Sequence, residues 1–558
     1  KPKTQKDSNE EERTRQQLDV LQKRIESINN SIINEFPAYA ELTRREPVAL
    51  KEIQGLLNNN EALITTIPSA DRAESTTHVF VVRPDQSMAY TVDLSTLDIQ
   101  QWVTALREGL DPTDDRSKPF DTIAAYALWW YLLSPAEEVL SGVDHLFVVP
   151  EGPLESLPLH LLITEDQSRL LPPIVEEVIP DSAASQAGVQ PGDVIVSFGG
   201  VPISKIHQVK EITRAHPNQE LEIEILRKGN RIPLKVTPRS MTIEGRKMVL
   251  IGIQFDLTGL LLPGLKGSGQ RGFTVATEST QVTTDSNVGY QDIAWLAKKY
   301  AITTLPSVAS LRALRVFAKR AEATEPFIGF GAPVLGGHVG ESKGLQVASF
   351  YRGAVADVDE VRQLSSLPET ETELRAMAEY LGADESSIYL RERATETQVK
   401  EIALNQSKVV AFSTHGLVSG ELKGLAEPAL VLTPPDKGTE YDDGLLTASE
   451  VAQLKLDADW VILSACNTAA GDKPGATGLS GLAKAFFYAG ARALLVSHWP
   501  VESNAATALT TNMFQKLKQN PMIGRAEALR QSMMALASNP KTAHPFFWAP
   551  FVVVGEGG

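Results

Sequence analysis

The chain has 558 residues, several times the roughly 100–200 residues of one domain, so we expect about three or four folding units. Hydrophobic residues make up 42% of it and charged residues 22%, which excludes a mostly disordered or collagen-like chain. The 53 basic and 69 acidic residues give a net charge of −16. So acidic a surface repels phosphate groups, which argues against nucleic acid as a partner.

Cys466 is the single cysteine of the chain, which excludes an intramolecular disulfide and a cysteine-rich zinc site. We expect no metal and no other cofactor. The longest apolar runs are strand-sized, as at residues 493–496, so we expect no membrane span. Residues 1–15 are polar and predict no signal peptide, which favours the cytoplasm. The periplasm stays open if an upstream signal has been removed.

The N-terminal part is predicted to be helical at first and β-rich afterwards. Residues 1–65 form a helical segment and residues 66–119 a small β/α segment. Apolar residues three and four positions apart predict an amphipathic docking helix over residues 9–35: Leu18, Leu21, Ile25, Ile28 and Ile32. The elements expected next are strands at 78–83 and 89–94, a helix over 120–140 and a strand at 145–149.

Residues 169–258 have the size and pattern of a small β-rich domain. The predicted elements are strands at 174–178, 193–198, 221–227 and 232–237 and a helix over 204–215. The run Ala-Gly-Val-Gln-Pro-Gly-Asp-Val-Ile at residues 187–195 comes shortly before a Gly199-Gly200 turn. With this run the segment resembles a PDZ domain, in particular those of bacterial site-2 and HtrA-type proteases.

The resemblance to PDZ domains implies a peptide-binding groove between strand 174–178 and the helix over 204–215. Such a groove accepts a polypeptide C-terminus or an extended peptide. The residues expected to line it are Leu171, Ile174, Val175, Ile206, Val209 and Lys210.

Motifs for nucleotide binding and serine hydrolysis are rejected. Gly267–Gly272, in a Gly-rich linker over 259–289, satisfies G-x-G-x-x-G, but a β-prone run follows it instead of the helix that a pyrophosphate site needs. Gly478–Leu482 fails G-x-S-x-G at its last position, which disfavours a serine nucleophile. The sequence contains no G-x-x-x-x-G-K-[ST] phosphate loop.

From residue 290 onward strands alternate with helices, which predicts a mostly parallel α/β sheet covered on both faces. The expected strands are 327–330, 409–413, 460–464, 493–497 and 551–554. The expected helices are 369–381, 395–404, 448–454, 478–489 and 504–516.

A histidine and the single cysteine follow two of these strands. His415 comes after strand 409–413, and Cys466 comes after strand 460–464. Because ligands of such sheets sit at the carboxyl ends of the strands, we expect the two side chains to approach each other as a cysteine–histidine dyad. The imidazole would take the thiol proton, and the amides of Gly416 and Cys466 would stabilise an oxyanion. The alternative is a buried, inert Cys466 and a core or helix-cap His415.

Motifs around these residues resemble those of CHAT domains, a bacterial branch of the caspase and separase clan of cysteine peptidases. The motifs are Phe412–Gly416, Asp443–Glu450, Val461–Thr468, Gly478–Phe486, Ala489–Arg492, Ser497–Val501 and Pro545–Phe551. The resemblance spans residues 120–164 and 290–554. It implies an α/β fold with a caspase-like, mostly parallel sheet flanked by helices, in which the PDZ domain is inserted between peptidase parts at 120–168 and 290–558.

The same resemblance implies roles for individual residues. His415 acts as general base and acid, Cys466 is the nucleophile, and the backbone amides of Gly416 and Cys466 form the oxyanion hole. Ser497 to Trp499 offer a strand edge along which a peptide can pair, although Trp499 equally fits a core position. The residues expected to bind substrate are Ser464, Asn467, Asp472, Ser497, His498 and Trp499.

Two acidic positions of basic-selective relatives are not acidic here. Those relatives place an Asp two residues before the cysteine, where this chain has Ser464, and the family often shows Gly-Asp-Pro where it has Gly331-Ala332-Pro333. We therefore expect a small or apolar residue before the cleaved bond. The acidic loop Tyr441–Asp443 either contributes to substrate binding or to a metal-sensitive activation loop, or is a solvated turn before a helix capped by Thr447.

The leading hypothesis is a cysteine endopeptidase that cleaves a protein or peptide substrate, with the PDZ module recruiting substrate or regulating activity. The alternative is a non-catalytic scaffold in which both domains only bind partners. A thiol-dependent lipase or acyltransferase is a weaker idea, because no apolar acyl-channel pattern is visible in the sequence.

Overall fold

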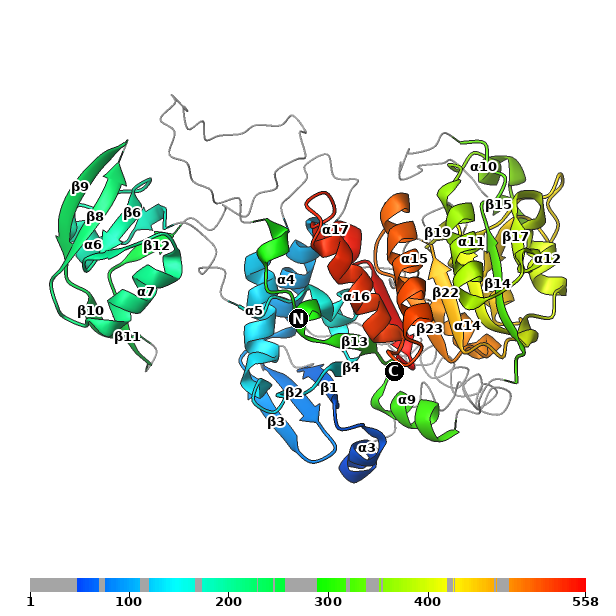
Figure 1. The fold of residues 1–558 in the computed structure, drawn as a ribbon, viewed down its shortest axis with the longest axis horizontal. Helices are drawn as coiled ribbons and strands as arrows, with labels where there is room; N and C mark the ends of the chain where they lie inside the picture. Colours follow the sequence, from blue (N-terminus) through cyan, green and yellow to red (C-terminus); the bar gives the residue numbers. More distant parts are fainter. Residues whose placement is uncertain are drawn as a thin grey trace, which may run out of the picture.

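The computed structural model shows a large α/β body and a smaller β-rich body, drawn at the left of Figure 1. It describes residues 48–69, 76–110, 120–165, 173–227, 229–243, 246–255, 289–317, 322–337, 351–352, 355–418, 425, 427–465, 468 and 481–557. The predicted helix over 9–35, Leu171 and nearly all of the linker over 259–289 lie outside these residues.

The large body is built on one sheet, with eleven strands in the described part of the chain. In spatial order they are β17 (Ile388–Leu390), β14 (Glu325–Gly331), β18 (Ser407–Ser413), β22 (Trp460–Ser464), β23 (Ala493–Ser497), β24 (Phe551–Gly555), β13 (Ala301–Thr304), β4 (His145–Val149), β1 (Glu61–Pro68), β2 (Thr77–Val82) and β3 (Ser87–Val92).

Most neighbouring strands of this sheet are parallel, as predicted. β17, β14, β18, β22 and β23 pair in parallel, and so do β13, β4 and β1. β24 pairs antiparallel with β23 over five residue pairs and meets β13 over two. β2 and β3 close one edge as an antiparallel hairpin. The central strands β22, β23 and β24 are buried throughout, as a sheet covered on both faces requires. Strand β18 is also buried except for one exposed residue, Lys408.

Helices cover both faces of the sheet (Figure 1). The core of one face includes side chains of α4 (Thr96–Glu108), α5 (Thr122–Leu132), α8 (Leu296–Lys299), α11 (Glu369–Leu381), α15 (Ser503–Gln519), α16 (Arg525–Ala537) and α17 (Pro545–Trp548). The core of the other face includes side chains of α3 (Leu50–Leu56), α9 (Val308–Arg312), α12 (Glu396–Glu401), α13 (Ala448–Val451) and α14 (Gly481–Ala489). Among the described residues, no helix is both long and apolar enough to cross a membrane.

Several predicted elements are confirmed and others are corrected. The strands at 145–149, 221–227, 460–464 and 493–497 and the helix over 369–381 have the predicted bounds. The helix predicted over 120–140 ends at Leu132, because Pro135 cannot continue it. The boundary predicted at residue 65 cuts through β1, and β1, β2 and β3 belong to the large sheet rather than to a separate segment.

In the sequence, the β-rich body is inserted between β4 and β13, and these two strands are neighbours in the large sheet. Its four-stranded sheet has the order β7 (Val201–Pro202), β6 (Val194–Phe198), β8 (Leu221–Arg227) and β9 (Asn230–Val236). The other elements are β5 (Val175–Val178), α6 (Ala183–Ala187), α7 (Ile206–Ala215), β10 (Arg239–Ile243), β11 (Arg246–Leu250) and β12 (Ile253–Phe255). It has a hydrophobic core of its own around Ile195, Phe198 and Ile223.

Small elements precede and follow β18 in the chain. A three-stranded sheet consists of β19 (Gly416–Leu417), β20 (Ala429–Val431) and β21 (Leu445–Thr447). The hairpin of β15 (Tyr351–Arg352) and β16 (Val355–Ala356) and the helix α10 (Val358–Arg362) precede α11 in the chain.

Candidate active site

The register of β18 and β22 places the carboxyl ends of these two strands side by side, and His415 and Cys466 follow these ends in the sequence. The strands pair in parallel, with Ser413 opposite Ser464, and the Thr414 N–H donates to the Ser464 carbonyl (3.2 Å). His415 therefore follows one strand end by two residues, and Cys466 follows the neighbouring end by two. Cys466, with Asn467 and Asp472, lies outside the described residues.

His415 is held in a defined orientation. Its Nε2–H donates to the backbone carbonyl of Ser365 (2.7 Å), in the loop between α10 and α11. The other ring nitrogen, Nδ1, is then the proton acceptor of the neutral ring. Burial lowers the pKa of His415, against the smaller opposing effect of the Ser365 carbonyl, so the ring is neutral at pH 7. A neutral, oriented imidazole is what a general base requires.

The backbone around His415 is fixed on both sides. The Thr414 hydroxyl donates to the Val431 carbonyl (2.6 Å), and the Val431 N–H donates to the His415 carbonyl (3.0 Å). Gly416, the predicted oxyanion donor, is buried at the start of β19 and pairs with Leu430 of β20. The loop that carries the histidine is thus anchored to β20.

Ser497, at the end of β23, holds the loop that contains the cysteine. Its hydroxyl donates to the Ala465 carbonyl (2.6 Å), and its N–H donates to Thr468 Oγ1 (2.9 Å). Ala465 and Thr468 flank residues 466–467, so Ser497 binds the chain on both sides of Cys466 and Asn467. Ser497 is itself fully buried, which makes it a positioning residue.

The strand edge predicted at Ser497 to Trp499 is not free. β23 lies between β22 and β24, Ser497 pairs with Phe551, and the His498 N–H donates to the Pro550 carbonyl (2.9 Å). Trp499 belongs to the core, and its Nε1–H donates to the Phe546 carbonyl (3.1 Å). This prediction was wrong because the antiparallel position of β24 is not visible in the sequence of β23.

A buried carboxyl group that the sequence analysis missed lies behind the two strand ends. Glu373 of α11 is 1% exposed and accepts a hydrogen bond from the Thr510 hydroxyl of α15 (2.6 Å). Burial raises its pKa, and the hydroxyls of Thr510, Ser464 and Ser413 oppose this effect. The signal was present in the sequence, because Glu373 shares the apolar face of α11 with Leu374 and Met377.

The acidic loop at Tyr441–Asp443 is a hydrogen-bonded turn. Asp442 accepts from the Thr397 hydroxyl (2.6 Å), and Asp443 accepts from the Ala356 N–H (2.6 Å). Both carboxylates are buried, so of the interpretations offered for this loop the solvated turn is wrong. Thr447 caps α13 as predicted, in a capping box with Glu450. Among the described residues, no three His, Cys, Asp or Glu side chains lie together so that they could hold a metal ion.

The residues predicted for the PDZ groove are mostly buried. Val175 and Val209 lie in the core of the small body, and Ile174 forms a bridge with Val194. Ile206, at the start of α7, is fully buried in the hydrophobic cluster that also contains residues of α5 in the large body. Lys210 is half-buried on α7.

Comparisons with known proteins match this two-body architecture. A model of the CHAT domain matches residues 282–556, and a model of the PDZ domain matches residues 174–227. The family models thus find a CHAT domain and a PDZ domain in this chain. These domains support a protease-like or peptide-binding role.

The relatives match parts of the chain. The zinc metalloprotease RasP of Geobacillus kaustophilus is 30% identical over 94 residues, which are 17% of this chain and 22% of RasP. The regulator of sigma-E protease RseP of Escherichia coli is 37% identical over 82 residues, 15% of this chain and 18% of RseP. Tetratricopeptide repeat protein 28 of Mus musculus is 30% identical over 224 residues, 34% of this chain and 9% of that protein. The chain thus spans less than a quarter of the length of these relatives.

Two solved structures are also similar in part. The Arg-specific cysteine proteinase gingipain R is 12% identical, with 46% of this chain and 55% of that chain covered and a TM-score of 0.29. The HtrA-type protease AlgW with a decapeptide is 26% identical, with 14% and 21% covered and a TM-score of 0.11.

Proposed function

We propose that the protein is a cysteine endopeptidase that hydrolyses a polypeptide substrate through His415 and Cys466. The observation that carries the proposal is the arrangement at the carboxyl ends of β18 and β22. There the two strand ends lie side by side, and the Ser365 carbonyl leaves Nδ1 of His415 as the proton acceptor. The CHAT domain over residues 282–556 contains both residues.

The proposed reaction uses the dyad twice. His415 Nδ1 takes the proton of the Cys466 thiol, and the thiolate attacks the carbonyl carbon of the scissile peptide bond. The amides of Gly416 and Cys466 stabilise the oxyanion of the tetrahedral intermediate. The C–N bond breaks as the imidazolium gives its proton to the leaving amine. Water, deprotonated by His415, then hydrolyses the thioester and releases the second product with the free thiol.

The proposed specificity is for a small or apolar residue before the cleaved bond. Neither Ser464 nor Ala332 supplies a negative charge for a basic side chain. Glu373 lies behind Ser464, but burial raises the pKa of its carboxyl group. Burial thus disfavours the charged carboxylate that would be needed to bind an Arg or Lys side chain.

The competing function is a non-catalytic scaffold, and thiol reactivity separates the two. In the peptidase, His415 activates Cys466, so we expect a peptide-linked electrophile to label Cys466 at least about tenfold faster than it labels free cysteine. His415→Ala should remove this advantage, whereas His78→Ala, at an exposed position on β2, should keep it. Mass spectrometry of the labelled peptide measures the rate. Equal labelling of wild type and His415→Ala would favour the scaffold.

The PDZ module is proposed to bind a polypeptide terminus or an extended peptide and to recruit substrate or regulate cleavage. If the module regulates cleavage, occupancy of the expected groove beside α7 should reach the active site as a change of rate. We expect a saturating peptide with a free C-terminus to change turnover of a small reporter substrate by at least about fivefold. The same peptide with an amidated C-terminus is the control. An unchanged rate would contradict regulation and leave recruitment as the role.

A further inference from the structure

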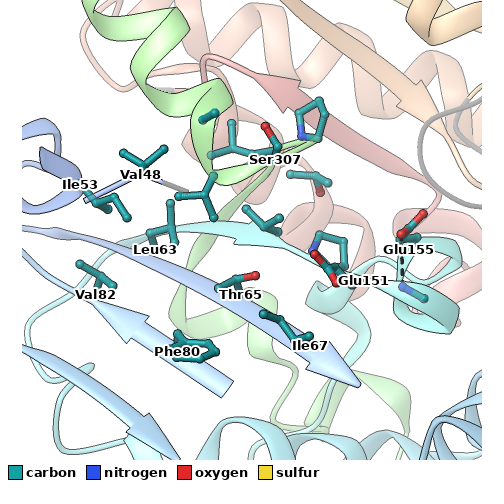
Figure 2. A pocket seen from close by; sticks show the side chains of 18 of the residues that line it. Val48, Ile53, Leu63, Thr65, Ile67, Phe80, Val82, Glu151, Glu155 and Ser307 are labelled. Atoms are coloured by element: carbon teal, nitrogen blue, oxygen red, sulfur yellow. Dashed lines mark hydrogen bonds between the residues drawn. The ribbon is translucent and has the colours of Figure 1, made fainter. Parts of the chain in front are cut away.

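A large hollow lies on the face of the sheet formed by β1, β2 and β24 (Figure 2). Its volume is about 860 Å³, within the roughly 300–1,000 Å³ range of ligand-binding pockets. Its apolar floor consists of alternate side chains of the strands, Leu63, Ile67, Phe80, Val82, Val552 and Val554. Leu50 and Ile53 of α3 and Val308 of α9 form its walls.

The hollow is an apolar surface without a complete cover in the described part of the chain. On this face α3 and α9 border β1 and β2, whereas α4 and α5 cover the opposite face. Ile67 is 40% exposed and Phe80 is 38% exposed. Neighbouring exposed apolar side chains of this kind mark binding surfaces.

The charge of the hollow selects among occupants. Glu151 and Glu155 are the charged side chains that line it, and the described lining contains no Lys or Arg. Glu155 Oε1 accepts from the Gly152 N–H (3.2 Å), which orients its carboxylate, and Glu151 is exposed (Figure 2). The exposed carboxylate of Glu151 beside an apolar floor attracts a cation and repels fatty acids and phosphorylated lipids.

One wall of the hollow is connected to the nucleophile loop. His498 lines the hollow, and the preceding residue, Ser497, binds both Ala465 and Thr468. The Arg107 guanidinium donates to the His498 carbonyl (3.1 Å) and fixes this wall. Burial, with smaller effects of the Arg107 and His160 charges, lowers the pKa of His498 to about 3, so the wall is neutral. An occupant of the hollow therefore lies next to the segment that holds the loop of Cys466.

We propose that this hollow binds an apolar polypeptide segment that carries a Lys or Arg side chain, and that the segment belongs to the substrate. The apolar side chains contact the floor formed by β1 and β2, and the cation lies at the exposed carboxylate of Glu151. The proposal rests on the proposed peptidase function for the identity of the occupant. It makes the hollow a second substrate-recognition site, separate from the PDZ groove.

Binding to the inactive Cys466→Ala protein tests the site without cleavage. The probe is a fluorescein-labelled peptide of Leu, Phe and Lys, and its counterpart has Glu in place of Lys. Phe80→Asp and Glu151→Lys change partly exposed positions, so both variants should fold. We expect each to raise the Kd of the Lys peptide by about tenfold or more. Leu97→Asp, at a 66% exposed apolar position on α4, is the matched control and should leave the Kd unchanged.

The outcomes separate this site from the peptidase proposal. Equal Kd values for the Lys and Glu peptides, or no effect of Phe80→Asp and Glu151→Lys, would overturn the site even if the wild type cleaves proteins. Tighter binding of the Glu peptide by Glu151→Lys would support the charge argument directly. If both variants weaken binding but the protein with Cys466 intact cleaves nothing, the site would stand and the peptidase function would be excluded.

Discussion

His415→Ala is expected to lower kcat/KM for a cleaved peptide by at least about 10³-fold, and Cys466→Ala is expected to do the same. Without His415 no base lies at the end of β18 to take the thiol proton, and the thiolate fraction falls. Without Cys466 no thiol is left in the chain. Steady-state kinetics on one peptide, with wild type and both variants at equal concentration, measure the effect.

The control for this pair is His78→Ala, because His78 is exposed on β2 and hydrogen-bonds Thr91 across the hairpin (2.9 Å). It should keep full activity. Circular dichroism should show that all three variants are folded. Activity of His415→Ala within a few-fold of the wild type would contradict the dyad, because other groups would then have to activate the thiol.

Arg315→Ala is expected to lower the free energy of unfolding by about 3–5 kcal/mol, since it leaves the buried Glu61 carboxylate without its guanidinium partner. Arg315 binds both carboxylate oxygens of Glu61 (2.7 Å each), and Glu61 is 3% exposed. Its guanidinium also lies 4.9 Å from the centre of the Phe147 ring. Burial alone would raise the pKa of Glu61, but the hydrogen bonds from Arg315 bring it below its ordinary value.

Urea unfolding followed by tryptophan fluorescence measures this loss. The matched control is Lys299→Ala, which removes an exposed ion pair with Glu137 (3.1 Å) and should have a much smaller effect. A change below about 1 kcal/mol for Arg315→Ala would show that water reaches Glu61 and replaces the guanidinium.

Local patterns were sufficient for the strands that precede His415 and Cys466 in the chain. The apolar runs ending at Ser413 and Ser464 predicted both strands, and the parallel pairing confirmed that their carboxyl ends are neighbours. The helix over 369–381 was predicted from its periodicity and ends at Gly382, in the left-handed conformation with φ 73°. These features depend on residues close together in the chain.

Features that depend on distant segments were not predicted. The hydrogen bond from His415 to Ser365 joins residues 50 positions apart, and the contact of Glu373 with Thr510 joins residues 137 apart. The free edge expected at Ser497 fails for the same reason, because Phe551 of β24 occupies it. Such contacts are set by the order of strands in the sheet, which no local pattern specifies.

The most direct test of the peptidase proposal is a mass-spectrometric survey of protein termini. A proteome extract from the source organism is incubated with the wild type and, separately, with Cys466→Ala. We predict new termini with the wild type alone, with small or apolar residues enriched before the cleaved bonds. The same set of termini with both proteins, or none with either, would contradict the claim that Cys466 cleaves peptide bonds.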